Sequence, residues 1–83
     1  MNNGNMSDII VKHIKITYEE GDERVRSFVK FLQSDRSDNV LTKYYQQAIL
    51  EKDGILNVSD KAGNEFTFVC NNAHRCNLQL RGM

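Results

Sequence analysis

The densest cluster of chemically reactive side chains lies near the C-terminal end of the sequence. Cys70, His74 and Cys76 stand within seven residues of one another, and thiolates and imidazoles are common zinc ligands. A structural zinc site takes four ligands, and His13, the other histidine of the chain, is the candidate for the fourth. However, His74 and Cys76 are separated by one residue, whereas zinc-binding pairs usually have wider gaps. We therefore expect structural roles for these residues, with no bound metal and no cofactor.

The two cysteines also allow a disulfide, because they lie six positions apart across an expected strand, turn and strand. Two cysteines are too few for a disulfide scaffold. The N-terminal residues lack the basic start and the apolar run of a secretion signal. We therefore expect a cytoplasmic protein in which Cys70 and Cys76 are free thiols.

Motifs for catalysis are missing from the sequence. A nucleophilic enzyme needs a serine or cysteine beside a histidine base and an orienting third group, and no motif here supplies this arrangement. The acidic residues between 19 and 23 lack calcium-loop spacing and fit the start of a helix. No phosphate-binding or dinucleotide-binding glycine pattern is present. We predict that the chain is not an enzyme and has no evident small-molecule substrate.

Length and composition restrict the chain to one small domain. It has 83 residues and a mass of 9.6 kDa, and the charges of its 11 basic and 11 acidic side chains cancel to a net charge of zero. Ile, Leu, Val and Phe make up about 27% of the residues, which is enough for a folded core. No run of apolar residues is long enough for a membrane span. Abundant asparagine without proline or tryptophan is typical of AT-rich coding sequence, which favours a bacterial, phage or plasmid origin.

The periodicity of apolar residues predicts a single α+β domain over 8–83, preceded by a flexible tail over 1–7. The expected elements are a strand over 8–18, a helix that begins after Asp22, a helix over 39–52, a hairpin of strands over 55–59 and 65–70, and a last strand over 77–81. This order indicates a mostly antiparallel sheet with two helices packed on one face. The residues expected in the core are Val25, Phe28, Leu32, Leu41, Ile49, Leu56, Phe66 and Phe68.

Three aromatic residues point to a surface that binds protein. Tyr44 and Tyr45 are adjacent, so both cannot point straight into a narrow core, and Phe31 flanks the apolar stripe of its helix. Exposed Tyr and Phe side chains are typical contact anchors. We predict a protein-binding module of the inhibitor, adaptor or antirepressor type. A homodimer is also expected, because the first strand is apolar on both faces near residues 9–11.

DNA binding is the alternative function. The order strand, helix, helix, hairpin resembles a winged helix-turn-helix that lacks its first helix, with 39–52 as the recognition helix. Lys43, Gln46 and Gln47 would then read bases, and Lys61 would lie at the tip of the wing. The charge balance opposes this function, because residues 19–38 carry six acidic and four basic side chains, whereas DNA binders usually present a basic face.

Overall fold

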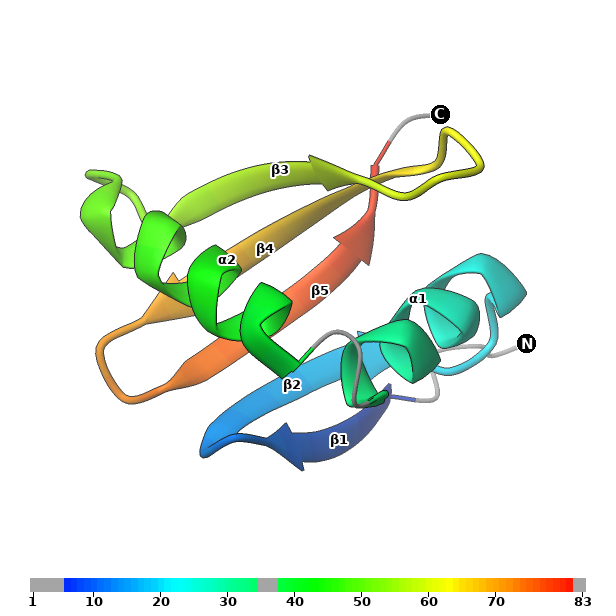
Figure 1. Ribbon diagram of the computed structural model, residues 1–83, viewed down its shortest axis with the longest axis horizontal. Coiled ribbons are helices and arrows are strands. Elements are labelled where there is room, and N and C mark those ends of the chain that lie inside the picture. The colour runs from blue at the N-terminus through cyan, green and yellow to red at the C-terminus, as the bar shows by residue number, and fades with distance from the viewer. Residues whose placement is uncertain (1–5, 35–37, 82–83) are drawn as a thin grey trace.

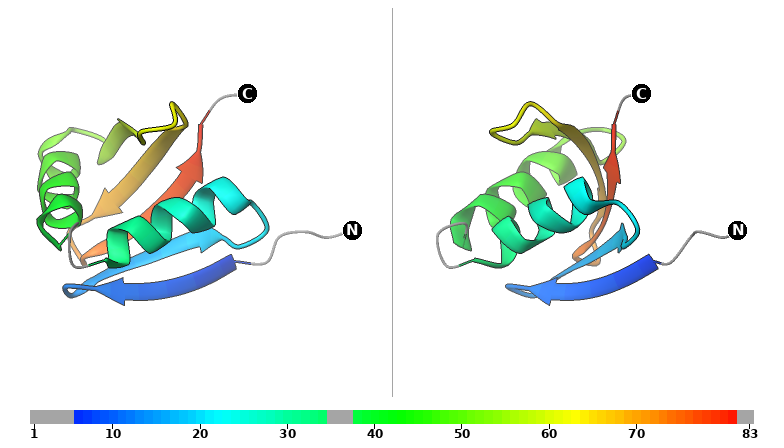
Figure 2. Two further views of the ribbon diagram at one scale, coloured as in Figure 1. Left: turned by 45° about the vertical axis from the view of Figure 1, so that its right-hand side comes forward. Right: turned by 90° about the vertical axis from the view of Figure 1, so that its right-hand side faces the viewer.

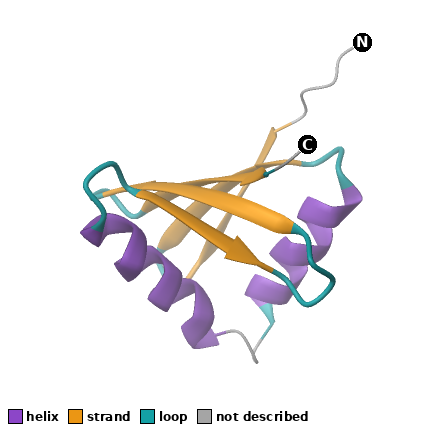
Figure 3. Ribbon diagram, turned by 90° about the horizontal axis from the view of Figure 1, so that it is seen from above, coloured by secondary structure: helices purple, strands orange, loops and turns teal. Residues whose placement is uncertain are grey.

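The computed structural model describes residues 6–34 and 38–81 of the chain. These residues form two layers, a five-stranded sheet and two helices that cover one of its faces (Figures 1 and 3). The sheet is antiparallel except for one parallel pair of strands. The structure therefore confirms the predicted α+β class. Neither described helix is long and apolar enough to cross a lipid bilayer.

The elements follow one another in the order ββααβββ. They are β1 (Met6–Val11), β2 (Ile14–Glu19), α1 (Glu23–Gln33), α2 (Asp38–Leu50), β3 (Ile55–Ser59), β4 (Glu65–Asn71) and β5 (Arg75–Leu80). The order of strands in the sheet is β1-β2-β5-β4-β3, with β2 and β5 parallel. The predicted hairpin corresponds to β3 and β4, and β5 begins two residues before the predicted last strand.

The prediction of one long strand over 8–18 is wrong, because this segment is a hairpin. Lys12 and His13 lie between β1 and β2 with φ angles of 53° and 69°. Two successive residues with positive φ form the tight turn that matches strand twist, although Asn and Gly usually occupy it. β1 begins at Met6, so residues 6 and 7, which were predicted as part of the tail, belong to a strand. Residues 1–5 of that tail lie outside the described residues.

Local signals fix the start of α1 and the passage from α2 to β3. Asp22 is the N-cap of α1, as predicted, and its carboxylate accepts a hydrogen bond of 2.9 Å from the Arg24 N–H. Gly54 has a φ of 73°, and a Cβ at this position would overlap the carbonyl oxygen of Cys70. Glycine is therefore required where the chain enters β3 against β4.

The core lies between the sheet and the helices, and most of the predicted core residues are in it. Those confirmed as buried are Val25, Phe28, Leu32, Leu41, Phe66 and Phe68. Leu56 is only half-buried, and Ile49 is wrong because its side chain is 39% exposed. α2 turns Leu41, Tyr45 and Ala48 toward the sheet, and this narrow stripe leaves Ile49 at its margin.

The stack of Phe28 on Phe66 joins α1 to the centre of the sheet, with ring centroids 4.4 Å apart. Because Phe28 is 3% exposed, we expect Phe28→Ala to lower the free energy of unfolding by about 3–5 kcal/mol. Phe31, one turn later, is 42% exposed, so Phe31→Ala should cost about 1 kcal/mol. Urea unfolding measures both, and equal losses in the two variants would contradict this placement of the helix face.

Candidate functional site: a groove between the helices

A groove on the helical face of the described residues has a mainly apolar lining. The C-terminal end of α1 and the N-terminal end of α2 approach each other, and the two helices diverge from there (Figure 3). The space between them has a volume of about 470 Å³ and is closed at one side by the β3–β4 turn. The residues that line it are Ser27, Phe28, Phe31, Tyr44, Ser59, Asp60, Lys61 and Ala62.

Aromatic rings form the apolar part of the groove. Phe28 is buried, and the Phe31 ring stacks beside it with centroids 6.1 Å apart. On the other side, Tyr44 is half-buried, and its ring lies 5.7 Å from that of Phe68. The structure therefore brings the predicted contact residues Phe31 and Tyr44 to the same groove, one from each helix. The 42% exposure of Phe31 makes it a large apolar side chain that solvent reaches there.

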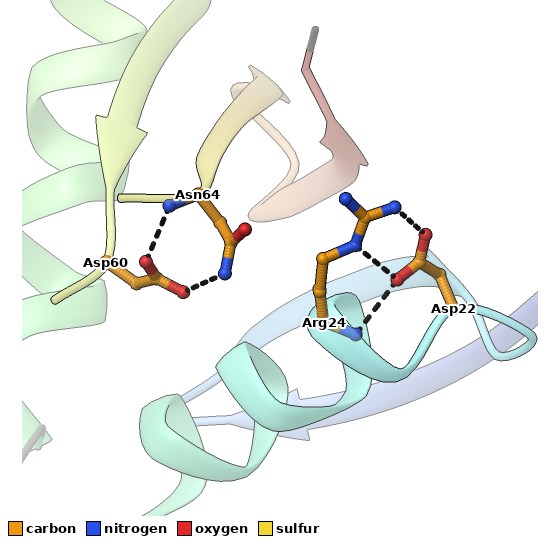
Figure 4. A network of polar contacts seen from close by, with 4 residues as sticks. All are labelled: Asp22, Arg24, Asp60 and Asn64. Atoms are coloured by element: carbon orange, nitrogen blue, oxygen red, sulfur yellow. Dashed lines mark hydrogen bonds and ion pairs between the residues drawn. The ribbon is translucent and has the colours of Figure 1, made fainter. Parts of the chain in front are cut away.

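A hydrogen-bonded carboxylate shapes the turn that closes the groove. Asp60 accepts hydrogen bonds from the Asn64 N–H at 2.9 Å and from the Asn64 amide nitrogen Nδ2 at 3.0 Å (Figure 4). It also accepts one of 2.9 Å from the Ala62 N–H. The bond from the Asn64 side chain is the main cause that lowers the pKa of Asp60, and the backbone N–H groups lower it further. This carboxylate is occupied in holding the turn, while Lys61 lines the groove beside it.

A second polar pair lies at the start of α1. The Arg24 guanidinium donates to both carboxylate oxygens of Asp22, at 3.2 and 3.0 Å (Figure 4). The hydrogen bond from Arg24 is the main cause that lowers the pKa of Asp22, and Asp22 in turn raises the pKa of Arg24. Since each charge is matched locally, this pair adds little net charge at the start of α1.

Tyr45 does not belong to the groove, although the sequence suggests it as a contact residue. It is 6% exposed and faces the sheet, because adjacent helical residues point about 100° apart. Its hydroxyl donates a 2.8 Å hydrogen bond to the Asn71 carbonyl oxygen and accepts one of 3.2 Å from the His74 N–H. Its ring stacks on the His74 imidazole at 5.0 Å. Tyr45 therefore fastens α2 to the β4–β5 turn.

Cys70 and Cys76 form a disulfide, so the expectation of free thiols is wrong. The two residues face each other directly on β4 and β5. The Cys70 N–H donates to the Gly54 carbonyl oxygen on the β3 side, so its backbone turns away from Cys76. Facing residues of this non-hydrogen-bonded kind bring their side chains close together. The register, and not the sequence spacing alone, makes the bridge geometrically accessible.

The zinc candidates lie at one end of the sheet without forming a metal site. His13 and His74 occupy neighbouring turns, because the Lys15 N–H donates to the His74 carbonyl oxygen at 2.8 Å. The two cysteines are joined to each other, and zinc binds thiolates and not disulfide sulfurs. Among residues 6–34 and 38–81, no group of three or more His, Cys, Asp or Glu side chains is placed to hold a metal ion.

The residues proposed for DNA contact are divided between two places. Lys43, Gln46 and Gln47 are exposed on α2, together with Leu50, whose side chain is 84% exposed. Lys61 lies instead in the β3–β4 turn and lines the groove. Lys43 is the one basic residue in the sequence of α2, so this helix carries little of the positive charge that phosphate binding requires.

The contribution of the β3–β4 turn to the groove is not predicted by the sequence. Ser59, Asp60 and Ala62 carry no contact signal in the sequence, where they appear as turn residues between two strands. They reach the groove because the sheet brings this turn beside α1. A local pattern does not contain that long-range placement.

Comparisons with known proteins provide no assignment for this site. No protein-family model, no curated protein and no solved structure matched the chain.

The disulfide closes a short loop, and we expect its reduction to lower the free energy of unfolding by about 2 kcal/mol. The cause is the larger conformational freedom of the unfolded chain once the link between β4 and β5 is gone. Urea titrations with and without a phosphine reductant measure this difference. A Cys70→Ala/Cys76→Ala variant is the control and should not respond to the reductant. An unchanged wild-type midpoint on reduction would contradict the expectation.

The β3–β4 turn should lose its carboxylate support in acid. The pKa of Asp60 in the folded chain lies below its ordinary value of 3.8, so the folded state binds this proton more weakly than the unfolded state does. The resulting stability is complete above that value and is lost as the pH falls through the lower folded pKa. We expect Asp60→Asn to be less stable than wild type at pH 7 and the difference to shrink below pH 3.8. Melting temperatures across this range test the sign, and a constant difference would contradict it.

Proposed function

We propose that the chain is a small non-enzymatic protein-binding module whose groove between α1, α2 and the β3–β4 turn receives an apolar side chain of a partner protein. The observation that carries the proposal is the exposure of Phe31 inside a concave, mainly apolar surface. Phe31 is 42% exposed although Phe28 and Tyr44 lie in the same groove. Aromatic side chains in such pockets usually contribute most of the binding energy of an interface.

The balance of charge supports a protein partner over a nucleic acid. The groove is lined by one acidic and one basic residue, Asp60 and Lys61, and the chain has no net charge. Nucleic-acid binding depends on an excess of basic residues, whereas the centre of a protein interface is depleted in charge. The DNA-binding alternative, with α2 as recognition helix, has less support, because Lys43 is the single basic residue of that helix.

The chemistry of the cysteines supports a binding role over a catalytic one. Cys70 and Cys76 are bonded to each other, so neither offers the thiolate that nucleophilic catalysis uses. Inhibitors, adaptors and antirepressors act by occupying a surface of another protein and need no such group. A phage- or plasmid-encoded regulator of this type remains our proposal for its biological setting.

The cytoplasmic location predicted from the sequence also remains a proposal. A disulfide is typical of oxidising compartments, and in the cytosol it is usually transient or redox-sensing. Alkylation of free thiols in acid-quenched cells measures how much of the protein carries the disulfide, and so distinguishes a stable bond from a transient one. In a cytosolic protein the Cys70–Cys76 disulfide should open under reducing conditions and form again under oxidising ones. Cysteines that stay fully blocked under both conditions would place the protein elsewhere.

Capture of the partner tests the proposed function. We expect the tagged chain to retain a protein from nuclease-treated extract of its source organism, and excess untagged chain to compete for that protein. Phe31→Ser should weaken the capture by about tenfold or more, because it removes the exposed ring from the groove. Leu50→Ser, which changes a side chain that is 84% exposed on α2, is the matched control.

Two outcomes would overturn the groove as the binding surface. One is a captured protein whose retention is the same with Phe31→Ser as with wild type. The other is retention that disappears on nuclease treatment and depends on Lys43 and Gln47, which would favour the DNA-binding alternative.

A further inference from the structure

β1 leaves one edge of the sheet open. It pairs with β2 on one side, and among residues 6–34 and 38–81 no strand pairs with it on the other. Figure 2 shows this strand at the border of the sheet, beside β2 and away from α2. Open edges present unpaired N–H and C=O groups that can bind another strand.

The hydrogen bonds of β2 show which backbone groups of β1 point outward. The Lys15 N–H donates to the His74 carbonyl oxygen, so the backbone of Lys15 is directed toward β5. Neighbouring residues of a strand direct these groups to opposite edges. Ile16 is therefore directed toward β1, where its partner Ile9 is directed back toward β2. It follows that Asp8 and Ile10 direct their N–H and C=O groups to the open edge.

The side chains of β1 do little to block a second strand. Ile10 is 72% exposed and Met6 is 52% exposed, and β1 contains neither proline nor a basic residue. Its single charge, Asp8, is turned toward its own sheet, where it accepts a 2.7 Å hydrogen bond from the Thr17 hydroxyl and lies 3.5 Å from the Lys15 ammonium. Edge strands in monomeric proteins usually carry lysine, proline or a bulge that prevents pairing.

We infer that the partner of this edge is a second copy of the chain, paired antiparallel along β1, with Ile9 facing Ile9 of the partner subunit. The two five-stranded sheets then form one continuous sheet around a two-fold axis perpendicular to it. An open edge is complementary to itself in this arrangement, because each strand supplies both donors and acceptors. This inference goes beyond the proposed function and does not depend on the groove.

Charge and hydrogen bonding together select the register. Residues that exchange N–H···O bonds across an antiparallel pair must both direct their groups outward, which restricts them to Met6, Asp8 and Ile10. Asp8 facing the partner's Asp8 would oppose two carboxylates. Ile10 facing the partner's Ile10 would pair the two strands over residues 9–11 alone. Asp8 facing the partner's Ile10 pairs them over residues 7–11, keeps the two Asp8 carboxylates from facing each other and places Ile9 on the axis.

The other open edge, β3, is less suited to this pairing. It is one residue shorter than β1, and its outward-facing Ile55 is 39% exposed, compared with 72% for Ile10. α2 also packs against β3, whereas α1 contacts β2 and β5. Burial of exposed apolar surface therefore favours β1 as the interface.

Sedimentation equilibrium on the oxidised full chain tests the inference at micromolar concentrations. Wild type should approach twice its mass of 9.6 kDa as the concentration rises. Ile10→Glu should raise the dissociation constant by about tenfold or more, because the new carboxylate faces the partner's Asp8. Ile10→Lys should retain the dimer, because its ammonium faces the same aspartate. Ile55→Glu, on the other edge, is the matched control and should dimerise as wild type does.

Amide hydrogen exchange in wild type provides a measurement that needs no variant. In the dimer, the N–H groups of Asp8 and Ile10 should exchange about tenfold more slowly as the concentration rises, because they become hydrogen-bonded. A single species of 9.6 kDa at all concentrations would overturn the inference. So would a dimer that Ile10→Glu leaves unchanged, or one that Ile55→Glu abolishes.

Discussion

The parallel pairing of β2 with β5 holds the two ends of the chain in one sheet. Its register runs from Lys15 opposite Arg75 to Tyr18 opposite Leu78, across 60 positions of sequence. Among the described residues β1 hydrogen-bonds to β2 alone, so the pairing of β2 with β5 joins the whole N-terminal hairpin to the rest of the sheet. Closing so long a loop costs conformational entropy, and the burial of residues such as Ile16 and Leu78 at the seam offsets that cost.

The groove is a consequence of this seam. α1 follows β2 and packs over β2 and β5, while α2 precedes β3 and packs over β4 and β3. Each helix therefore belongs to a different half of the sheet, and the two diverge where the halves twist apart (Figure 3). Two short helices do not cover the whole sheet. Near the β3–β4 turn, the side chains of Phe31 and Tyr44 line the space that remains between them. The exposed ring of Phe31 thus reflects the architecture of the fold.

Elements that depend on local chemistry could be predicted from the sequence. The helical stripe of α1, its Asp22 cap and the β3–β4 hairpin each need only neighbouring residues, and all are present. The β1–β2 turn was missed because Lys12 and His13 adopt positive φ without being Gly or Asn. In the same way, sequence spacing allows a disulfide between Cys70 and Cys76, but only the strand register makes them face each other.

The candidate site was predictable only in part, because a one-residue step decides the role of each tyrosine. Tyr44 and Tyr45 are equally aromatic in the sequence, and the rotation of α2 sends one to the groove and the other to the core. The choice depends on the β4–β5 turn, whose Asn71 carbonyl and His74 N–H engage the Tyr45 hydroxyl. The positions of the β3–β4 turn residues that line the groove depend in addition on the twist of the sheet.

The two proposed surfaces are compatible with each other because of the strand order. β1 is at one edge, and the groove lies toward β3 and β4, with β2 and β5 between them. Pairing through β1 therefore leaves Phe31 and Tyr44 uncovered. A two-fold axis perpendicular to the sheet also keeps both helical layers on one face, so a dimer presents two grooves in the same direction. Two such sites bind a symmetric or repetitive partner more tightly than either alone, since the second contact forms at a high effective concentration.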